Sequence, residues 1–261
     1  MLFRVLGPLA LETDEGEPHT PRAFKLRALL ALLCLYDGWV ASSEQLIDDL
    51  WSGAPPRTAA TALQVYVSKL RKHLDGAGFE VSRLATVPPG YALKLAPHTL
   101  DLHRFDALCA QARQLRAQGF LEEAAQALAE ALALWSGPAV ADLRAVPALR
   151  RRGCRLDEKW AVAYEQHAET ALLLGRHQPL IGELYGLIEE RPTWEAVHGH
   201  LMVALYRSGR TAESLMVYHR VRRALADERG TEPGPLLQRL QRAVLSRDLV
   251  LEDATKPHLA S

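Results

Sequence analysis

Cysteine is scarce in this sequence: its 261 residues include three, Cys34, Cys109 and Cys154. Their odd number and wide separation fit neither a disulfide framework nor the ligand spacing of a zinc site. We therefore expect a protein of a reducing compartment, with the three thiols packed inside as small apolar side chains. We also expect no bound metal, because His198-Gly199-His200 would direct its two imidazoles to different faces of a helix.

Long apolar runs are missing as well. The longest, residues 28–35, is far shorter than the ~20 residues that a membrane-spanning helix needs. Residues 1–15 do not combine a basic segment with an apolar core, as a secretory signal would. These absences predict a cytoplasmic protein without a membrane segment.

Sequence patterns of catalysis are absent too. The chain has no glycine-rich phosphate loop, no His-Glu-x-x-His zinc motif and no serine framed as a nucleophile elbow. Adjacent carboxylates such as Asp48-Asp49 cannot share one helix face, so we interpret them as solvated charges. We expect a protein that is not an enzyme, needs no cofactor and works by binding.

The pattern that is present in abundance is helical. Aromatic residues make up only 7% of the chain, whereas Ala, Leu, Arg and Glu recur throughout. In the first hundred residues, glycine and proline divide the chain into short strands, three helices and a hairpin, which is the order of a winged helix-turn-helix. The expected elements are a strand turned at Gly7-Pro8 within 2–11, helices at 23–36, 44–50 and 58–74, and strands at 79–87 and 91–95. Pro88-Pro89-Gly90 joins the last two strands, with Gly90 expected at positive φ.

Beyond residue 97 every segment has a helical period and an internal repeat appears. Gly175 and Gly209 end two similar segments 34 residues apart, the period of a tetratricopeptide helix pair. A third copy around Gly119 lies 56 residues before Gly175, so we expect an insertion around 136–157. The predicted fold class is mainly α: a winged helix-turn-helix domain (α+β) at 1–96, an all-α tetratricopeptide-like repeat domain at 97–251 and a flexible tail at 252–261.

The expected helix at 58–74 carries the most functional information. Its larger apolar residues recur at helical spacing and form one narrow stripe, namely Leu63, Val67, Leu70 and Leu74. The side chains opposite or beside this stripe are Thr61, Gln64, Val65, Ser68, Lys69 and Lys72, with Tyr66 and Arg71 at the edges. Such a face suits the DNA major groove, where Gln pairs with an adenine edge, Lys with a guanine edge, and Val or Thr contacts a thymine methyl. An amphipathic helix whose charges are simply solvated has the same pattern. The surrounding sequence is therefore needed to distinguish a DNA-binding helix from an ordinary surface helix.

The surrounding sequence is basic, although the formal net charge of the whole chain is zero. Between residues 57 and 94, six Lys and Arg residues stand against Asp75 and Glu80, a local balance of +4 (six minus two). The six are Arg57, Lys69, Arg71, Lys72, Arg83 and Lys94. A local excess of this kind is expected where a surface faces phosphates, and it favours DNA binding.

Residues 2–95 resemble the OmpR-type winged helix. The matching segments are Phe24-Lys25-Leu26, Leu46–Trp51 (LIDDLW), Leu63–Leu74 (LQVYVSKLRKHL) and Thr86–Tyr91 (TVPPGY). Leu100–Phe105 (LDLHRF) and Leu134–Gly137 (LWSG) are similar to the bacterial transcriptional activator domain. In order and spacing, the two parts together resemble the Streptomyces antibiotic regulatory proteins in their short, two-domain form.

This resemblance implies roles for individual residues. Its recognition helix corresponds to Thr58–Leu74, with base-edge contacts expected from Thr61, Gln64, Val65, Tyr66, Ser68 and Lys69. Phosphate contacts are expected from Arg71, Lys72, Trp51, Thr86 and Tyr91. The helical period places Tyr66 at the edge of the core, and Trp51 and Tyr91 are equally compatible with packing roles.

The resemblance also implies partners: double-stranded DNA with direct repeats, bound by two or more self-associating copies, and RNA polymerase holoenzyme. The expected function is transcriptional activation of a secondary-metabolite (antibiotic) gene cluster. One alternative from another class stays open, a tetratricopeptide-type docking scaffold whose winged domain is not essential. An enzyme of unknown type has no group of residues in its favour.

Overall fold

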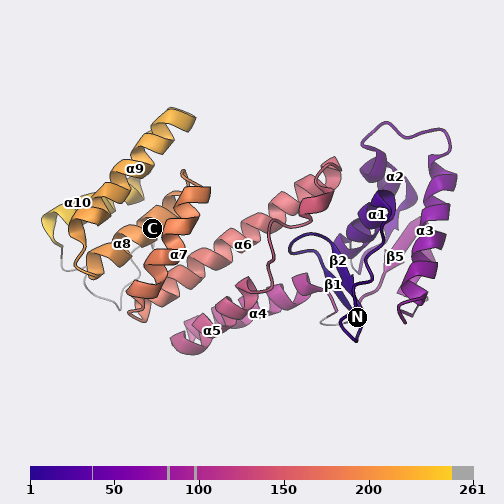
Figure 1. Ribbon diagram of the computed structural model, residues 1–261, viewed down its shortest axis with the longest axis horizontal. Helices are drawn as coiled ribbons and strands as arrows, with labels where there is room; N and C mark the ends of the chain where they lie inside the picture. Colours follow the sequence, from indigo (N-terminus) through magenta and orange to yellow (C-terminus); the bar gives the residue numbers. More distant parts are fainter. Residues whose placement is uncertain (37, 81–82, 97–98, 249–261) are drawn as a thin grey trace. The chain divides into compact units, whose positions relative to one another are not determined.

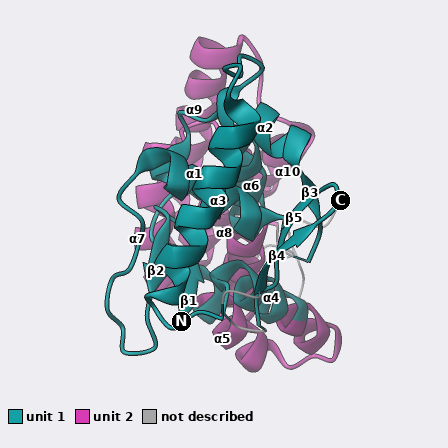
Figure 2. Cartoon of the chain, turned by 90° about the vertical axis from the view of Figure 1, so that its right-hand side faces the viewer, with its two compact units in different colours: residues 1–110, 130–161 teal, residues 111–129, 162–261 magenta. Residues whose placement is uncertain are grey.

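A computed structural model of the chain describes residues 1–36, 38–80, 83–96 and 99–248. The expected tail at 252–261 lies outside the described residues. The chain forms two compact units, coloured separately in Figure 2. Unit 1 consists of Met1–Ala110 and Glu130–Ala161, and unit 2 of Gln111–Ala129 and Val162–Ser261. Unit 1 therefore contains residues 1–96, the expected winged helix, together with parts of the expected helical half. The domain boundary at residues 96–97 stays a prediction.

The first hundred residues form the expected winged helix-turn-helix (Figure 1). Its elements are β1 (Leu2–Arg4), β2 (Ala10–Glu12), α1 (Phe24–Leu35), β3 (Ala41–Ser42), α2 (Ser43–Trp51), α3 (Ala59–Asp75), β4 (Leu84–Val87) and β5 (Gly90–Leu93). β1 and β2 are antiparallel, with Phe3 opposite Leu11. A second sheet has the strand order β3-β5-β4, and β4 and β5 form the wing.

The start of α2 and the burial of α1 agree with what their sequences predict. The Oγ of Ser42 accepts a hydrogen bond from the backbone N–H of Gln45 at 3.0 Å, which caps the start of α2. Residues 28–34 of α1 are all buried, so this helix forms the centre of the winged-helix core. The mainly α fold class, a winged helix followed by a helical domain, is confirmed.

Two expectations in the hairpin region were wrong, and one short strand there had not been predicted. Residues 79, 80 and 83 of the expected strand are not in a strand, and β4 begins only at Leu84; Phe79 instead packs its ring edge on Phe3, with ring centroids 5.5 Å apart. The short strand β3 was not expected. Gly90 does not have a positive φ. It must be glycine because a Cβ there would lie 1.9 Å from the carbonyl oxygen of Ala41, where β3 pairs with β5.

The N-terminal β1–β2 hairpin is held by residues from the expected helical half. Asp101, which is 3% exposed, accepts hydrogen bonds from the backbone N–H groups of Val5 and Leu6 at 2.9–3.0 Å. The N–H of Ser136 donates to the carbonyl of Leu6 at 2.9 Å. Asp142 accepts from the N–H of Leu9 and forms an ion pair with Arg27. The segments 100–105 and 134–137 thus belong to the same compact unit as the winged helix.

The remaining helices include the expected repeats. They are α4 (Asp101–Ala117), α5 (Leu121–Leu132), α6 (Pro147–Leu173), α7 (His177–Glu190), α8 (Glu195–Arg207), α9 (Thr211–Arg229) and α10 (Pro235–Ser246), with a 3₁₀ turn, η2, at Ala141–Leu143. Gly119, Gly175 and Gly209 separate α4 from α5, α6 from α7 and α8 from α9, each at a φ between 72° and 85° that only glycine adopts freely. The expected insertion corresponds to residues 133–146 and the first turns of the long α6.

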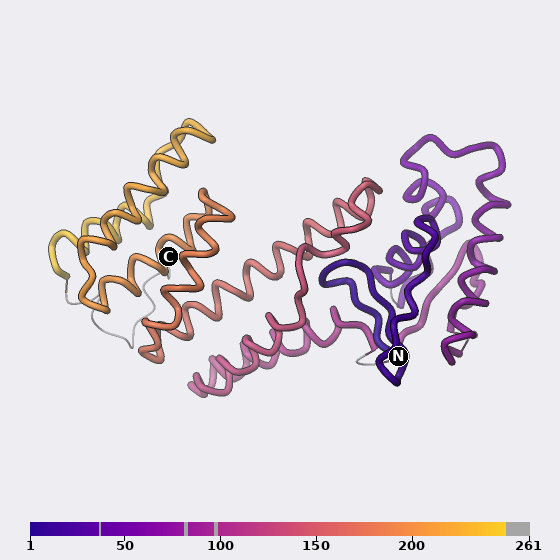
Figure 3. Tube along the Cα trace, viewed as in Figure 1, coloured from indigo at the N-terminus to yellow at the C-terminus, as the bar shows by residue number. Residues whose placement is uncertain are grey.

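Within unit 2, the helices stack on their neighbours in the sequence, and the chain can be followed through them in Figure 3. α8 packs against α7, α9 and α10, and is the most deeply buried of these helices. The side chains of His198 and His200 are both buried in it, 0% and 2% exposed. No helix in the described part of the chain is long and apolar enough to cross a membrane. The expectation that all three cysteines are buried was wrong: Cys34 is buried, but Cys154 is exposed on α6.

Candidate nucleic-acid interface

The helix α3 is anchored to unit 1 by one apolar ridge. The ridge residues Leu63, Val67, Leu70 and Leu74 are all at most 1% exposed, and Ala59 continues the ridge at the start of the helix. α3 packs against both α1 and α2. Because the ridge takes up one side of the helix only, the other side is available to a partner, and α3 lies along one edge of unit 1 in Figure 1.

The side chains on the free side of α3 are those that the helical period predicted. Thr61, Gln64, Val65, Ser68, Lys69 and Lys72 are exposed, and Val65 keeps 44% of its surface accessible. Lys69 and Lys72 form no ion pair with any residue that the structure describes. Two uncompensated cations beside small polar groups give a surface that attracts phosphates and offers hydrogen bonds to base edges.

A stacked pair of aromatic rings lies where α2 ends beside α3. The rings of Trp51 and Tyr66 are nearly parallel, at 18°, with centroids 6.1 Å apart. The ammonium of Lys25 lies 5.1 Å from the Trp51 ring centroid and donates a hydrogen bond to the carbonyl of Leu50 at 2.6 Å. Partial burial lowers the pKa of Lys25. Trp51 and Tyr66 are half-buried, so both have an accessible edge as well as a packing role.

Sequence reasoning missed Lys25 as a part of this site. Its motif, Phe24-Lys25-Leu26, was recognised only as the opening of a helix. The contact with Trp51 depends on how α1 packs against α2, which no spacing within either helix reveals.

Arg71 connects α3 to the wing. Its Nε and Nη2 donate hydrogen bonds to the carbonyl of Leu84 at 2.9 and 2.8 Å, and Nη2 also donates to the hydroxyl of Thr86 at 2.9 Å. Three donors of the guanidinium fork are thereby directed at strand β4. Tyr91, on the neighbouring strand, is only 8% exposed, which favours its packing role. Thr86 is exposed at the rim of the wing.

Two histidines join the C-terminal end of α3 to the loop before α1. The Nε2 of His19 donates to the carbonyl of His73 at 2.9 Å, and the Nε2 of His73 donates to the carbonyl of His19 at 2.6 Å. The two rings are stacked, with centroids 4.2 Å apart. The start of α3 is less constrained, because Thr58 is exposed and its side chain makes no capping hydrogen bond.

Comparisons with known proteins agree with this architecture. Residues 18–93 match the domain described as "Transcriptional regulatory protein, C terminal", and residues 100–245 match the bacterial transcriptional activator domain. The chain is 35% identical over 254 residues to Regulatory protein DnrI of Streptomyces peucetius, covering 95% of this chain and 93% of that protein.

Two longer proteins are similar over part of their length. The chain is 40% identical to Regulatory protein AfsR of Streptomyces coelicolor but covers only 25% of it. It is 37% identical to Transcriptional regulatory protein EmbR of Mycobacterium tuberculosis and covers 63% of that protein. A solved structure, Mycobacterium tuberculosis EmbR in complex with a low affinity phosphopeptide, superimposes with a TM-score of 0.90 at 36% identity, over 97% of this chain and 68% of the other.

A winged helix of the OmpR type that precedes a bacterial transcriptional activator domain defines a class of transcriptional regulators. The chain belongs to the Streptomyces antibiotic regulatory protein family.

Proposed function

We propose that this regulator is an activator that acts in the cytoplasm and reads DNA with the free side of α3. The observation that carries the proposal is the exposed set of Gln64, Val65, Lys69 and Lys72 on a helix whose opposite ridge is buried. A helix anchored in this way can enter the major groove without losing its own packing. Phosphate contacts then supply most of the affinity, and base-edge contacts of ~1–3 kcal/mol each supply selectivity.

We propose different tasks for the twelve expected residues. In this proposal Thr61, Gln64, Val65, Ser68 and Lys69 contact base edges, and Thr58, Lys72, Trp51 and Thr86 contact phosphates. The support is that Trp51 is half-buried and the other eight side chains are exposed. We propose that Tyr66, Arg71 and Tyr91 act chiefly as supports: Tyr66 stacks on Trp51, Arg71 holds the wing and Tyr91 packs beneath it. Exposed, unpaired cations on α3 also argue against a scaffold whose winged domain has no role.

We further propose that two or more copies associate on direct repeats near a promoter and recruit RNA polymerase holoenzyme. The target genes would belong to a secondary-metabolite cluster. The support for this part is similarity to DnrI and AfsR, two regulatory proteins of Streptomyces.

Selection of bound sequences from a random duplex pool, followed by footprinting of the enriched DNA, tests the proposal. We expect one motif, present as a direct repeat, with both copies protected. Recovery of no motif, or equal affinity for enriched and random DNA, would contradict sequence-specific binding. A motif that occurs singly would contradict the direct-repeat part alone.

A further inference from the structure

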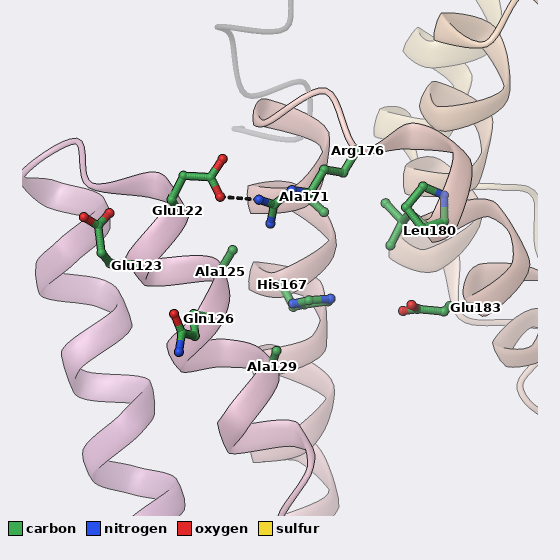
Figure 4. Close-up of a pocket in the computed structure, with 11 residues that line it drawn as sticks. Glu122, Glu123, Ala125, Gln126, Ala129, His167, Ala171, Arg176, Leu180 and Glu183 are labelled. Carbon is green, nitrogen blue, oxygen red and sulfur yellow. Dashed lines mark hydrogen bonds and ion pairs between the residues drawn. The ribbon is translucent and has the colours of Figure 1, made fainter.

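Unit 2 contains a cavity of about 570 Å³ bordered by α5, α6 and α7 (Figure 4). This volume lies in the range of ~300–1,000 Å³ that small-molecule sites occupy. The cavity exists because three positions that face it carry alanine: Ala125 and Ala129 on α5, and Ala171 on α6. Leu180 of α7 adds an apolar wall opposite α5. The body of any occupant would therefore meet methyl groups and a leucine side chain.

A histidine with an unused hydrogen-bonding atom borders this cavity. The Nδ1 of His167 is buried, and no group of the described residues lies within hydrogen-bonding distance of it. Burial lowers the pKa of His167, so its imidazole is neutral at pH 7. A buried polar atom without a partner costs free energy unless something else satisfies it. In Figure 4 the His167 ring points from α6 towards Glu183 on α7.

The carboxylates around the cavity are only partly compensated. Glu122 forms an ion pair with Arg176, drawn as a dashed line in Figure 4. Glu123 and Glu183 have no basic partner among the residues that the structure describes; Glu183 accepts a hydrogen bond from the hydroxyl of Tyr164 at 3.5 Å. With one arginine against three glutamates and a neutral histidine, the cavity has an excess of negative charge.

We propose that this cavity is a binding site for a small molecule that has an apolar body and one protonated amine. The apolar body occupies the space left by Ala125, Ala129 and Ala171, and the ammonium lies beside Glu183. The imidazole of His167 borders the bound ligand. The site is independent of the DNA-binding face of α3, since all of its residues belong to unit 2.

Three probes that share one body and differ only in their head group test the proposal: phenylpropylamine, phenylpropanol and phenylpropanoate. Each is titrated into the full chain labelled for NMR, and the amide and imidazole signals of residues 122–129, 167, 171 and 180–183 are followed. We expect saturable shifts at these signals and at least about tenfold tighter binding of the amine than of the carboxylate, with the alcohol between them.

Two variants and one control variant show whether the probes bind in this cavity and whether Glu183 causes the preference for the amine. Glu183→Gln should reduce the preference for the amine over the alcohol by at least about threefold. Glu189→Gln removes the same charge from an exposed position of α7 outside the cavity and should leave the preference unchanged. Ala129→Leu should weaken all three probes by filling the cavity, and because Ala129 is exposed the chain should still fold.

The proposal is overturned if no probe gives saturable shifts at these signals. It is also overturned if amine and carboxylate bind equally well, or if Glu183→Gln behaves like Glu189→Gln. Glu183 is exposed, so Glu183→Gln should not disturb the fold. The test therefore still holds if Ala129→Leu perturbs the fold.

Discussion

Arg71 on the recognition helix donates a hydrogen bond to the hydroxyl of Thr86 on the wing at 2.9 Å. The same guanidinium also holds the Leu84 carbonyl through two N–H groups. In the proposed mode of binding, α3 and the wing both contact DNA. A residue that links them would then fix the geometry with which both approach the duplex.

Arg71→Ala should therefore weaken DNA binding because it loosens the wing, and not because a phosphate contact is lost. We expect faster amide hydrogen exchange in β4 and β5 of the free protein, and weaker DNA binding with an unchanged salt dependence. Lys72→Ala, the neighbouring exposed cation, should leave wing exchange unchanged and reduce the slope of log K against log[salt] by about 0.9. The reverse pattern, a reduced slope and an unaltered wing for Arg71→Ala, would make Arg71 a phosphate contact.

Asp101 should be essential to the stability of unit 1. Its carboxylate accepts the N–H groups of Val5 and Leu6 in a site that is almost fully buried, and Asp101→Ala leaves both donors without a partner. We expect a loss of about 2–4 kcal/mol in the free energy of unfolding, measured by urea denaturation. Asp101→Asn keeps one acceptor oxygen and should cost less than the alanine variant. Equal and negligible losses for both variants would show that the hairpin is held by other contacts.

The paired histidines should stabilise the end of α3 cooperatively. His19 and His73 each donate to the backbone carbonyl of the other, so removing either ring breaks one direct hydrogen bond and the ring stack. We expect each alanine variant to lower the free energy of unfolding by about 1 kcal/mol. A double-mutant cycle should show a coupling free energy of at least about 0.5 kcal/mol between the two histidines. Strict additivity would mean that the two contacts form independently of one another.

Unit 2 should lose stability in mild acid. Burial lowers the pKa of His167, His177 and His198 below the usual value near 6.5. The unfolded chain therefore binds more protons than the folded chain as the pH falls through 6.5, and stability decreases in that direction. Thermal unfolding at pH 7.5 and 5.5 measures the effect. His167→Gln should reduce the pH dependence, because it removes one of these three imidazoles. A melting temperature that is equal at the two pH values would contradict this expectation.

The local patterns in the sequence predicted the helices and the free face of α3 well. Leu63, Val67, Leu70 and Leu74 follow the helical period, and this period alone determines which side is buried. The repeat glycines were visible for a similar reason, because a helix that must end at positive φ selects glycine.

Contacts between distant segments could not be predicted in this way. The attachment of Asp101 to Val5, and of Lys25 to the end of α2, depends on tertiary packing that leaves no period in the sequence. The requirement for Gly90 was expected for the wrong reason, since it comes from the approach of β3, a strand of two residues that carries no pattern of its own. The partly compensated carboxylates beside His167 are likewise contributed by different helices.

Affinity for two DNAs tests whether the free side of α3 reads base sequence. We compare the unchanged chain with two variants, Lys69→Ala and Arg113→Ala. Arg113 is an exposed basic residue in unit 2 and serves as the control. The affinity of each protein is measured for the enriched repeat and for a scrambled duplex of the same length, at the same salt concentration. We predict that Lys69→Ala loses at least about tenfold more affinity for the repeat than for the scrambled duplex, while Arg113→Ala changes neither. Equal losses on the two duplexes would contradict base reading by this face.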